Sequence, residues 1–387
     1  MAFRKRNVAL GGSTSNAAAA PASKPEGAPG VKPSPFTSHP VTSTGSSSLD
    51  SLLGGHGGLS LGSSLFIEES GMTDYGGALL SYYAAEGLCQ GHTIHLVGMG
   101  DHWIRELPGV AAQKSSSRRE QSPADEEKMK IAWRYERLGQ AGERALPIRQ
   151  PPGQTSIPQE EVPFCHTFDL TKRLTLPKDA KINHIQISRD AQPFDPILQS
   201  LSRSLSTSPP NTIHRLIIPS ILSPGLYPPH ACIPQNFLRI LHNLRALLRQ
   251  HHTKLTAMLT LPLELYPRSQ GLVRWAELLS DGVLELTPFP HRMDAYTEAA
   301  KPNEEQPQGM VKVHKVPIDT ERGEGGAGAG NSMGEDLAFT VSRRKFAIKP
   351  FSLPPMEGDQ EAQAQKEGAE KPAGNAVGKL SGKDLEF

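Results

Sequence analysis

Apolar and polar residues along the chain follow two alternating periods, which predict strands and helices in turn. Short apolar runs bounded by turn residues, the pattern of buried strands, occupy residues 65–70, 92–99, 213–220, 254–262 and 282–289. Between them, apolar residues recur with helical spacing over residues 77–90, 235–252 and 271–280. Strands that alternate with helices of these lengths predict a mainly parallel central sheet flanked by helices on both faces.

The last regular segments have a different pattern. GMVKVHKVP (309–317) and LAFTVSRRKFAIKPF (337–351) alternate apolar and polar residues, and no helical pattern lies between them. They predict an antiparallel pair at a sheet edge, joined by a Gly-rich loop. The predicted fold class is therefore α/β, with antiparallel strands added near the C-terminus.

Composition divides the 387 residues into a folded region and polar tracts. Residues 1–33 and 354–379 are rich in small residues, Pro and Gly, so they are predicted to be a disordered N-terminal arm and a disordered acidic tract. Residues 34–353 form a single predicted domain, and residues 380–387 form a short C-terminal motif. Polar insertions are expected near residues 113–127, 139–161 and 319–336.

Charge and cysteine usage exclude several classes of protein. The chain has 41 basic and 40 acidic residues, a net charge of +1, so binding to RNA would need a local basic patch. Cys89, Cys165 and Cys232 form no C-x-x-C pair, which argues against a disulfide scaffold or a thiolate metal site. No apolar run approaches the roughly 18 residues that span a bilayer. We expect a soluble intracellular protein without a metal or a membrane partner.

The segment GMTDYGGA, residues 71–78, has the glycine spacing of a phosphate-binding loop. Gly71 and Gly76 are correctly spaced, but Gly77 and Ala78 stand where Lys and Ser or Thr are needed. The strand that should end in a metal-positioning acid ends in Ser220 instead. The favoured interpretation is a strand-to-helix turn that binds no cofactor. One alternative is a residual, metal-poor nucleotide site at a shared subunit boundary, and the other is an intact single-chain ATPase.

No other catalytic arrangement emerges from the sequence. Cys165 and His166 are adjacent, and neighbours on a strand point to opposite faces, so a packed Cys with a hydrogen-bonded His is favoured over a catalytic pair. Glu68 and Glu69 follow a strand, and such carboxylates more often cap helices or pair with arginines than act as general acids. We predict no catalytic residue.

Two segments carry candidate contact residues. The nucleic-acid candidates, in SRRKFAIK, are Arg343, Arg344, Lys345 and Lys349. On one strand, the alternating positions 343, 345 and 349 would face RNA phosphates, although a solvated strand face explains them too. The partner-interface candidates, in KIAWRYERL, are Trp133, Arg134, Tyr135 and Arg137, although core packing explains the two aromatic residues equally well.

Several of these segments together resemble one family. STGSSSLDSLLGGHGGLSLGSSLFIEE (43–69) resembles the opening of RecA-like domains. The other segments are KIAWRY (130–135), FCHTFDLTKRL (164–174), RLIIPSILSP (215–224), VRWAELLSDGVLELTPFPH (273–291), GMVKVHKVP (309–317) and DLAFTVSRRKFAIKPFSLPP (336–355). Taken in this order, they resemble the family of subunit four of the Elongator complex, and a fungal member of it.

The resemblance implies properties that the periodicity does not show. It implies a RecA-like fold with a degenerate phosphate loop, a heterohexameric ring with Elongator subunits five and six, and contact with subunits one, two and three. It also implies tRNA as a partner and the carboxymethyl-type modification of the wobble uridine as the shared task, with the chemistry in subunit three. The chain would then be an accessory subunit in cytoplasm and nucleus, with ATP only at ring subunit boundaries.

Two alternatives of other classes stay open at this point. One is a ring ATPase with a composite site, in which Arg134 or Arg137 acts across a subunit boundary. The other is a transcription-associated scaffold, for which the sequence offers no DNA-reading motif.

Overall fold

The computed structural model describes residues 28–53, 57–111, 162–290, 306–317, 326–327 and 336–351. The first half contains β1 (Val31–Pro33), β2 (Pro40–Thr42), α1 (Ser47–Leu52), β3 (Leu59–Ser60), β4 (Ser64–Glu69), α2 (Tyr75–Cys89), β5 (Thr93–Val97), α3 (Asp101–Arg105), β6 (Pro108–Val110), β7 (Phe168–Arg173) and β8 (Lys181–Ile185). The second half contains α5 (Asp195–Thr207), β9 (His214–Ile218), the 3-10 helix η1 (Pro229–Cys232), α6 (Pro234–Gln250), β10 (Leu255–Pro262), α7 (Gly271–Leu279), β11 (Gly282–Pro288), β12 (Gly309–Val316), β13 (Gly326–Ala327), β14 (Leu337–Val341) and β15 (Phe346–Pro350).

One large sheet organises the molecule, with strands in the order β15-β14-β12-β11-β4-β10-β9-β5-β8. The six strands from β11 to β8 are parallel. The strands β12, β14 and β15 continue the sheet in antiparallel fashion beyond β11. The predicted α/β fold class is confirmed: the domain has a mainly parallel central sheet with added antiparallel strands.

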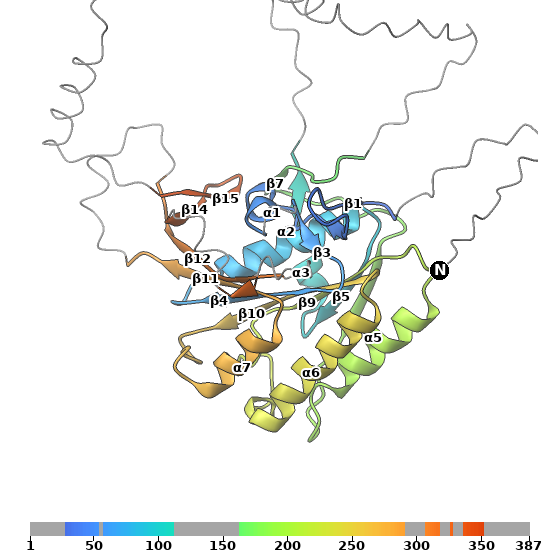
Figure 1. Cartoon of the computed structure of the whole chain (residues 1–387), viewed down its shortest axis with the longest axis vertical. Helices are drawn as coiled ribbons and strands as arrows, with labels where there is room; N and C mark the ends of the chain where they lie inside the picture. The colour runs from blue at the N-terminus through green and yellow to red at the C-terminus, as the bar shows by residue number, and fades with distance from the viewer. Residues whose placement is uncertain are drawn as a thin grey trace, which may run out of the picture.

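Helices cover both faces of this sheet, as Figure 1 shows, with α2 on one side and α5, α6 and α7 on the other. Along β4, Leu65 and Ile67 pack into the core beneath α2, whereas Phe66 packs into the core beneath the other three helices. Every residue of the central strand β9 is buried, because a parallel strand covered on both faces has no side turned to water.

A buried arginine connects the sheet to the N-terminal strands. Arg215 on β9 has no exposed surface. Its guanidinium donates to His92 Nδ1 at 2.9 Å, to the Tyr83 carbonyl at 2.9 Å and to the Thr42 hydroxyl at 2.8 Å. One side chain therefore links β9 to α2, to the turn before β5 and to β2.

The structure corrects three expectations about the chain. The disordered arm was predicted to reach residue 33, but residues 31–33 form β1, which pairs with β2. The segment 337–351 is a hairpin of two strands, because residues 342–345 form a turn whose Ser342 N–H donates to the Lys345 carbonyl. The Gly-rich insertion near 319–336 contains the two residues of β13, which pair with β12. The insertions near 113–127 and 139–161 and the tract 354–379 lie outside the described residues.

Candidate functional site

The loop between β4 and α2 holds a carboxylate of the chain itself at the position that suits a phosphate. Glu69, at the end of β4, accepts hydrogen bonds from the backbone N–H groups of Tyr75 at 2.9 Å and Gly76 at 2.8 Å, and from the Thr73 hydroxyl at 2.8 Å. Backbone N–H groups at a helix N-terminus are the donors that bind phosphate in a working loop of this kind. Here Glu69 occupies them, and its side chain is buried.

Two other carboxylates satisfy the rest of the loop. Asp74 caps α2 by accepting from the Gly77 N–H at 3.0 Å. Glu264, which follows β10, accepts from the Gly71 N–H at 2.9 Å. An approaching phosphate would therefore meet three acidic groups around amides that are already hydrogen-bonded.

The glycines of the loop fit these carboxylates. A Cβ atom on Gly77 would lie 2.3 Å from Asp74 Oδ2, and one on Gly76 would lie 3.1 Å from Glu69 Oε2. Gly71 has a φ of 90°, in the region that favours glycine. Ala78 packs against the core at the position where a working loop has its metal-binding hydroxyl. The same glycine spacing therefore accommodates internal carboxylates.

The end of β9 is also without a metal-positioning acid. Ser220, two residues beyond the strand, donates its backbone N–H to the Thr260 hydroxyl at 2.7 Å. Its φ of 41° lies in the left-handed region, which costs free energy for a non-glycine residue. Both elements of a nucleotide site thus differ from the working form in this chain. That no nucleotide binds stays a prediction.

Replacing Glu69 by alanine should destabilise the protein and open an anion site. Three donors lose their acceptor, so we expect the free energy of unfolding to fall by about 2–3 kcal/mol. The emptied helix end should then bind sulfate, so sulfate should stabilise this variant more than the wild type. Urea unfolding in sodium sulfate and in sodium chloride measures both effects.

The matched control is Glu69→Gln, which keeps the shape and leaves no room for an anion. It should show the ordinary sulfate effect of the wild type. An alanine variant as stable as the wild type, with the same sulfate response, would show that Glu69 does not hold this helix end.

Glu68 lies on the opposite face of β4 and has no exposed surface. Its Oε2 is 3.1 Å from Arg268 Nε, and Arg268 also pairs with Glu277 at 2.8 Å and with Glu285 at 3.3 Å. Burial, then the charge of Glu277, raises the pKa of Glu68 to about 8. The expectation that these carboxylates cap a helix or pair with an arginine is confirmed: Glu68 lies beside Arg268, and Glu69 accepts from the first amides of α2.

The adjacent Cys165 and His166 do not form a catalytic pair. His166 Nδ1 lies 3.0 Å from Glu86 Oε1, while the Cys165 thiol points to the His166 carbonyl. Burial raises the pKa of the Cys165 thiol to about 11, which leaves almost no thiolate at neutral pH. The interpretation of a packed Cys beside a hydrogen-bonded His is confirmed.

The four basic nucleic-acid candidates lie in and after the turn between β14 and β15. Arg343, Arg344 and Lys345 are exposed in the turn, and Lys349 is exposed on β15. The expectation that positions 343, 345 and 349 share one face of a strand is wrong, because the turn interrupts the strand. A tight turn projects consecutive side chains in different directions, so all three basic residues reach solvent.

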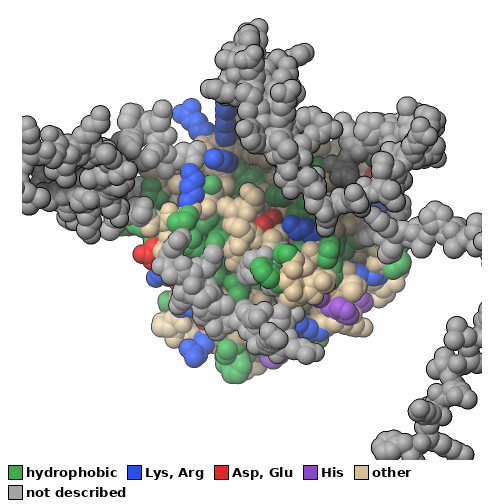
Figure 2. All heavy atoms as spheres, turned by 45° about the horizontal axis from the view of Figure 1, so that its top comes forward, with side chains coloured by type: hydrophobic (Ala, Val, Ile, Leu, Met, Phe, Trp, Pro, Cys, Tyr) green, Lys and Arg blue, Asp and Glu red, His purple; other side chains and the backbone are tan. Residues whose placement is uncertain are grey.

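The structure adds a second basic segment to this turn. The Leu170 N–H on β7 donates to the Arg344 carbonyl at 2.8 Å, so β7 runs beside the hairpin. Lys172 and Arg173, which are exposed on β7, therefore lie near Arg344. We call the residues Lys172, Arg173, Arg343, Arg344, Lys345 and Lys349 the basic hairpin surface. In Figure 2 several Lys and Arg side chains gather on the face turned forward.

Asp169, next to the basic hairpin surface, is affected by the positive charge of that surface. The pKa of Asp169 is lowered, first by hydrogen bonds from Thr171 and further by the positive charges of Lys172 and Arg344. Sequence reasoning missed Lys172 and Arg173 because more than 160 residues separate them from the turn. The only sequence signal was the basic pair itself in FCHTFDLTKRL.

The predicted interface residues Trp133, Arg134, Tyr135 and Arg137 lie outside the described residues, so that role stays a prediction. The structure exposes a different aromatic side chain, Trp275 on α7, to 52%. Leu278, one helical turn further, is 53% exposed on the same face. No helix in the described part of the chain is long and apolar enough to cross a membrane.

Comparisons with known proteins assign the chain to a family. The family model described as PAXNEB protein matches residues 24–387. Elongator complex protein 4 of Schizosaccharomyces pombe is 36% identical over 357 residues, which cover 88% of this chain and 93% of that protein. Elongator complex protein 4 of Saccharomyces cerevisiae is 28% identical over 363 residues, with 84% and 76% covered.

A solved structure of low similarity is a KaiC-like protein from Pyrococcus horikoshii. Its TM-score is 0.41 at 13% identity, and the match covers 80% of this chain and 99% of the other. The family model spans almost the whole sequence, and the S. pombe relative shares more than a third of its aligned residues. The chain belongs to the PAXNEB family, the family of Elongator complex protein 4.

Proposed function

We propose that this chain is a non-catalytic subunit of the Elongator complex, which forms a hexameric ring with subunits five and six. In this ring it binds tRNA for the carboxymethyl-type modification of the wobble uridine. The observation that carries the proposal is the loop between β4 and α2, in which Glu69, Asp74 and Glu264 take the amide donors that a nucleotide would need.

Family membership supports the assembly part of the proposal, since the relatives are named as proteins of the Elongator complex. Other Elongator subunits are therefore its partners. The basic hairpin surface supports the RNA part, because a protein with a net charge of +1 needs a local cluster of cations to bind phosphates. The chain contributes assembly and RNA binding, and any ATP in the ring lies at subunit boundaries.

Native mass spectrometry of the full chain mixed with Elongator subunits five and six tests the assembly. We expect a mass equal to two copies of each subunit, which increases by one tRNA mass when tRNA is added. A lone monomer would overturn the proposal. ATP turnover that appears only in the assembled ring and falls in Arg134→Ala would favour the composite ATPase instead.

The basic hairpin surface should contribute to tRNA affinity through phosphate contacts. The double variant Arg343→Ala/Arg344→Ala, assembled into the ring, should bind tRNA on the order of tenfold more weakly at 0.1 M salt. The slope of log affinity against log salt concentration should become less steep by about 2. Fluorescence anisotropy over a salt series measures both quantities.

Arg203 and Arg274 provide the control, since both are exposed and lie on helices away from the hairpin. The variant Arg203→Ala/Arg274→Ala loses the same charge and should keep the wild-type affinity and slope. Equal losses in the two double variants would mean that only the overall charge matters.

A further inference from the structure

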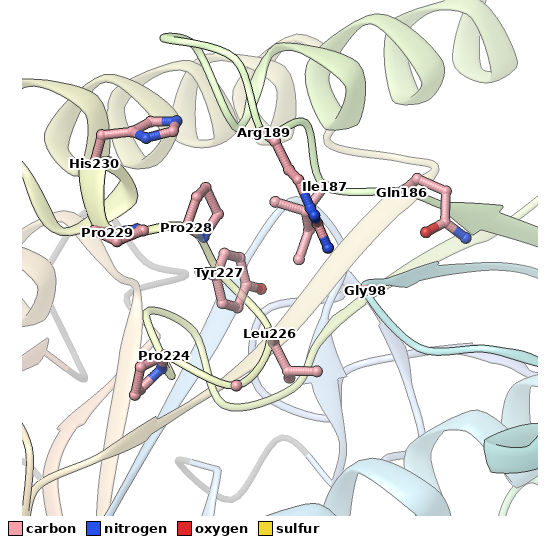
Figure 3. A pocket seen from close by; sticks show the side chains of 11 residues that line it. Gly98, Gln186, Ile187, Arg189, Pro224, Leu226, Tyr227, Pro228, Pro229 and His230 are labelled. Atoms are coloured by element: carbon pink, nitrogen blue, oxygen red, sulfur yellow. The ribbon is translucent and has the colours of Figure 1, made fainter.

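A pocket outside the degenerate loop lies at the carboxyl ends of three parallel strands. It is formed by residues after β5 (Gly98), after β8 (Gln186, Ile187 and Arg189) and after β9 (Pro224–His230). Its volume is about 550 Å³, within the range of sites that hold small ligands. Figure 3 shows Arg189 and Tyr227 extending into this space from different loops.

The walls of the pocket are fixed by hydrogen bonds. The His230 ring donates to the Asp190 carbonyl, which joins the loop after β8 to the loop after β9. Asn236 strengthens this link, because its amide donates to the His230 carbonyl at 2.9 Å and to the Ala191 carbonyl at 3.3 Å. The pocket therefore has a defined shape before any ligand enters.

The loop after β9 also holds backbone strain. Ser220 and Leu222 have φ angles of 41° and 67°, which cost free energy in residues other than glycine. The Tyr227 N–H donates to the Ser223 carbonyl at 2.9 Å, which sets Tyr227 beneath the rim. Strain of this kind persists only where the surrounding structure enforces it, and it is concentrated at binding and active sites.

Two side chains of the pocket, Tyr227 and Arg189, have a polar group without a partner within the described residues. Tyr227 is 3% exposed, and its hydroxyl makes no hydrogen bond in the part of the chain that the structure describes. A buried hydroxyl without a partner is destabilising, and a ligand acceptor would remove this cost. The exposed guanidinium of Arg189 likewise has no ion pair there, and the lining contains no acidic residue.

A pocket with apolar walls, a cation and a hydroxyl donor suits a ligand that has a flat ring and a negatively charged group. Ile187, Leu226 and Pro228 are half-buried and offer apolar surface for a ring. Arg189 can stack on a heterocycle or bind a phosphate, as arginine does at many RNA sites. Tyr227 supplies a hydroxyl donor for a carbonyl oxygen of a base or for a ribose.

We propose that this pocket binds one nucleotide unit, a base with its phosphate, and that single-stranded RNA supplies it. This inference rests on the proposed function, because the same RNA would contact the basic hairpin surface. Free mononucleotides share the chemistry, so the experiment includes them.

The test fills the pocket without changing charge. A Cβ atom on Gly225 would meet only Ser223 Oγ at 4.0 Å, so Gly225→Phe can be accommodated and places a ring in the pocket. The matched control is Gly271→Phe at the start of α7, where a Cβ atom meets nothing within 4 Å. A second variant, Arg189→Ala, removes the cation, with Arg203→Ala as its control.

Each variant is assembled into the ring with subunits five and six and titrated with labelled tRNA, with UMP and with AMP. For tRNA we expect Gly225→Phe and Arg189→Ala to bind on the order of tenfold more weakly, while both controls stay within twofold of the wild type. RNA containing 4-thiouridine should crosslink to the peptide that contains Tyr227 in the wild type and not in Gly225→Phe.

The outcomes separate this inference from the proposed function. A ring that assembles and binds tRNA equally well with Gly225→Phe and Gly271→Phe overturns the pocket and leaves the proposed function intact. If Gly225→Phe abolishes the binding of UMP or AMP and leaves tRNA binding unchanged, the pocket is a nucleotide site, but its ligand is a free mononucleotide and RNA is overturned as the source. If the wild-type ring binds neither RNA nor mononucleotides, the pocket is overturned and so is the RNA-binding part of the proposed function.

Discussion

Replacing Arg215 by methionine is expected to lower the free energy of unfolding by about 3–5 kcal/mol, the largest loss that we expect from a single substitution. Methionine fills similar space, but His92, the Tyr83 carbonyl and the Thr42 hydroxyl each lose a buried donor. Burial, and then the charge of Arg215, lowers the pKa of His92 to about 3. Urea denaturation followed by tryptophan fluorescence measures the loss.

Two controls separate charge from geometry at this position. Arg215→Lys keeps the positive charge but not the fork of donors, so its loss should be nearly as large. Arg203→Met changes an exposed arginine on α5 and should alter stability by less than about 0.5 kcal/mol. If Arg215→Met were as stable as Arg203→Met, the buried hydrogen bonds would contribute nothing net.

The variant Glu68→Gln should become more stable relative to the wild type as pH rises. The pKa of Glu68 is raised from 4.5 to about 8 in the folded protein. Between these values the native state binds more protons than the unfolded state, so wild-type stability falls as pH rises from about 4.5 to about 8. The slope from this residue approaches 1.4 kcal/mol per pH unit, and glutamine, which stays neutral, removes it.

Urea unfolding at pH 5, 6, 7 and 8 checks this prediction. The difference between Glu68→Gln and the wild type should grow across the series, to on the order of 2 kcal/mol or more at pH 8. Glu106→Gln, at an exposed glutamate after α3, should give a constant difference. A constant difference for Glu68→Gln as well would mean that Glu68 stays charged beside Arg268 throughout.

The parallel strands and the helices between them could be predicted because each one is marked by a pattern of apolar residues within its own segment of sequence. The predicted strand at 254–262 and helix at 271–280 lie within a residue of β10 and α7. Helix α5 was missed, although Ile197, Leu201 and Leu205 recur at helical spacing, because the surrounding Ser and Pro residues resemble a loop. The sequence does not predict the turn between β14 and β15, because SRRK has no glycine to mark it.

At the loop between β4 and α2, only the absence of the residues that a nucleotide needs could be predicted from the sequence. Gly77 and Ala78 in place of Lys and Ser or Thr could be read directly from the sequence. That Glu69 and Glu264 fill the loop could not, because Glu264 is 193 residues from the Gly71 amide that it binds. The pairing of β7 with the basic turn and the pocket beneath Arg189 likewise depend on tertiary packing, which no local pattern encodes.

Glu69 is part of the polypeptide itself, and this has a consequence for regulation. A nucleotide-binding loop alternates between occupied and empty forms, so its subunit responds to the ratio of ATP to ADP in the cell. The anion at the start of α2 is a side chain of the same polypeptide, and neither hydrolysis nor exchange can remove it. With Glu69 in place, and no nucleotide bound as we predict, this helix end stays in one state, and we expect energy-dependent timing to originate in other subunits.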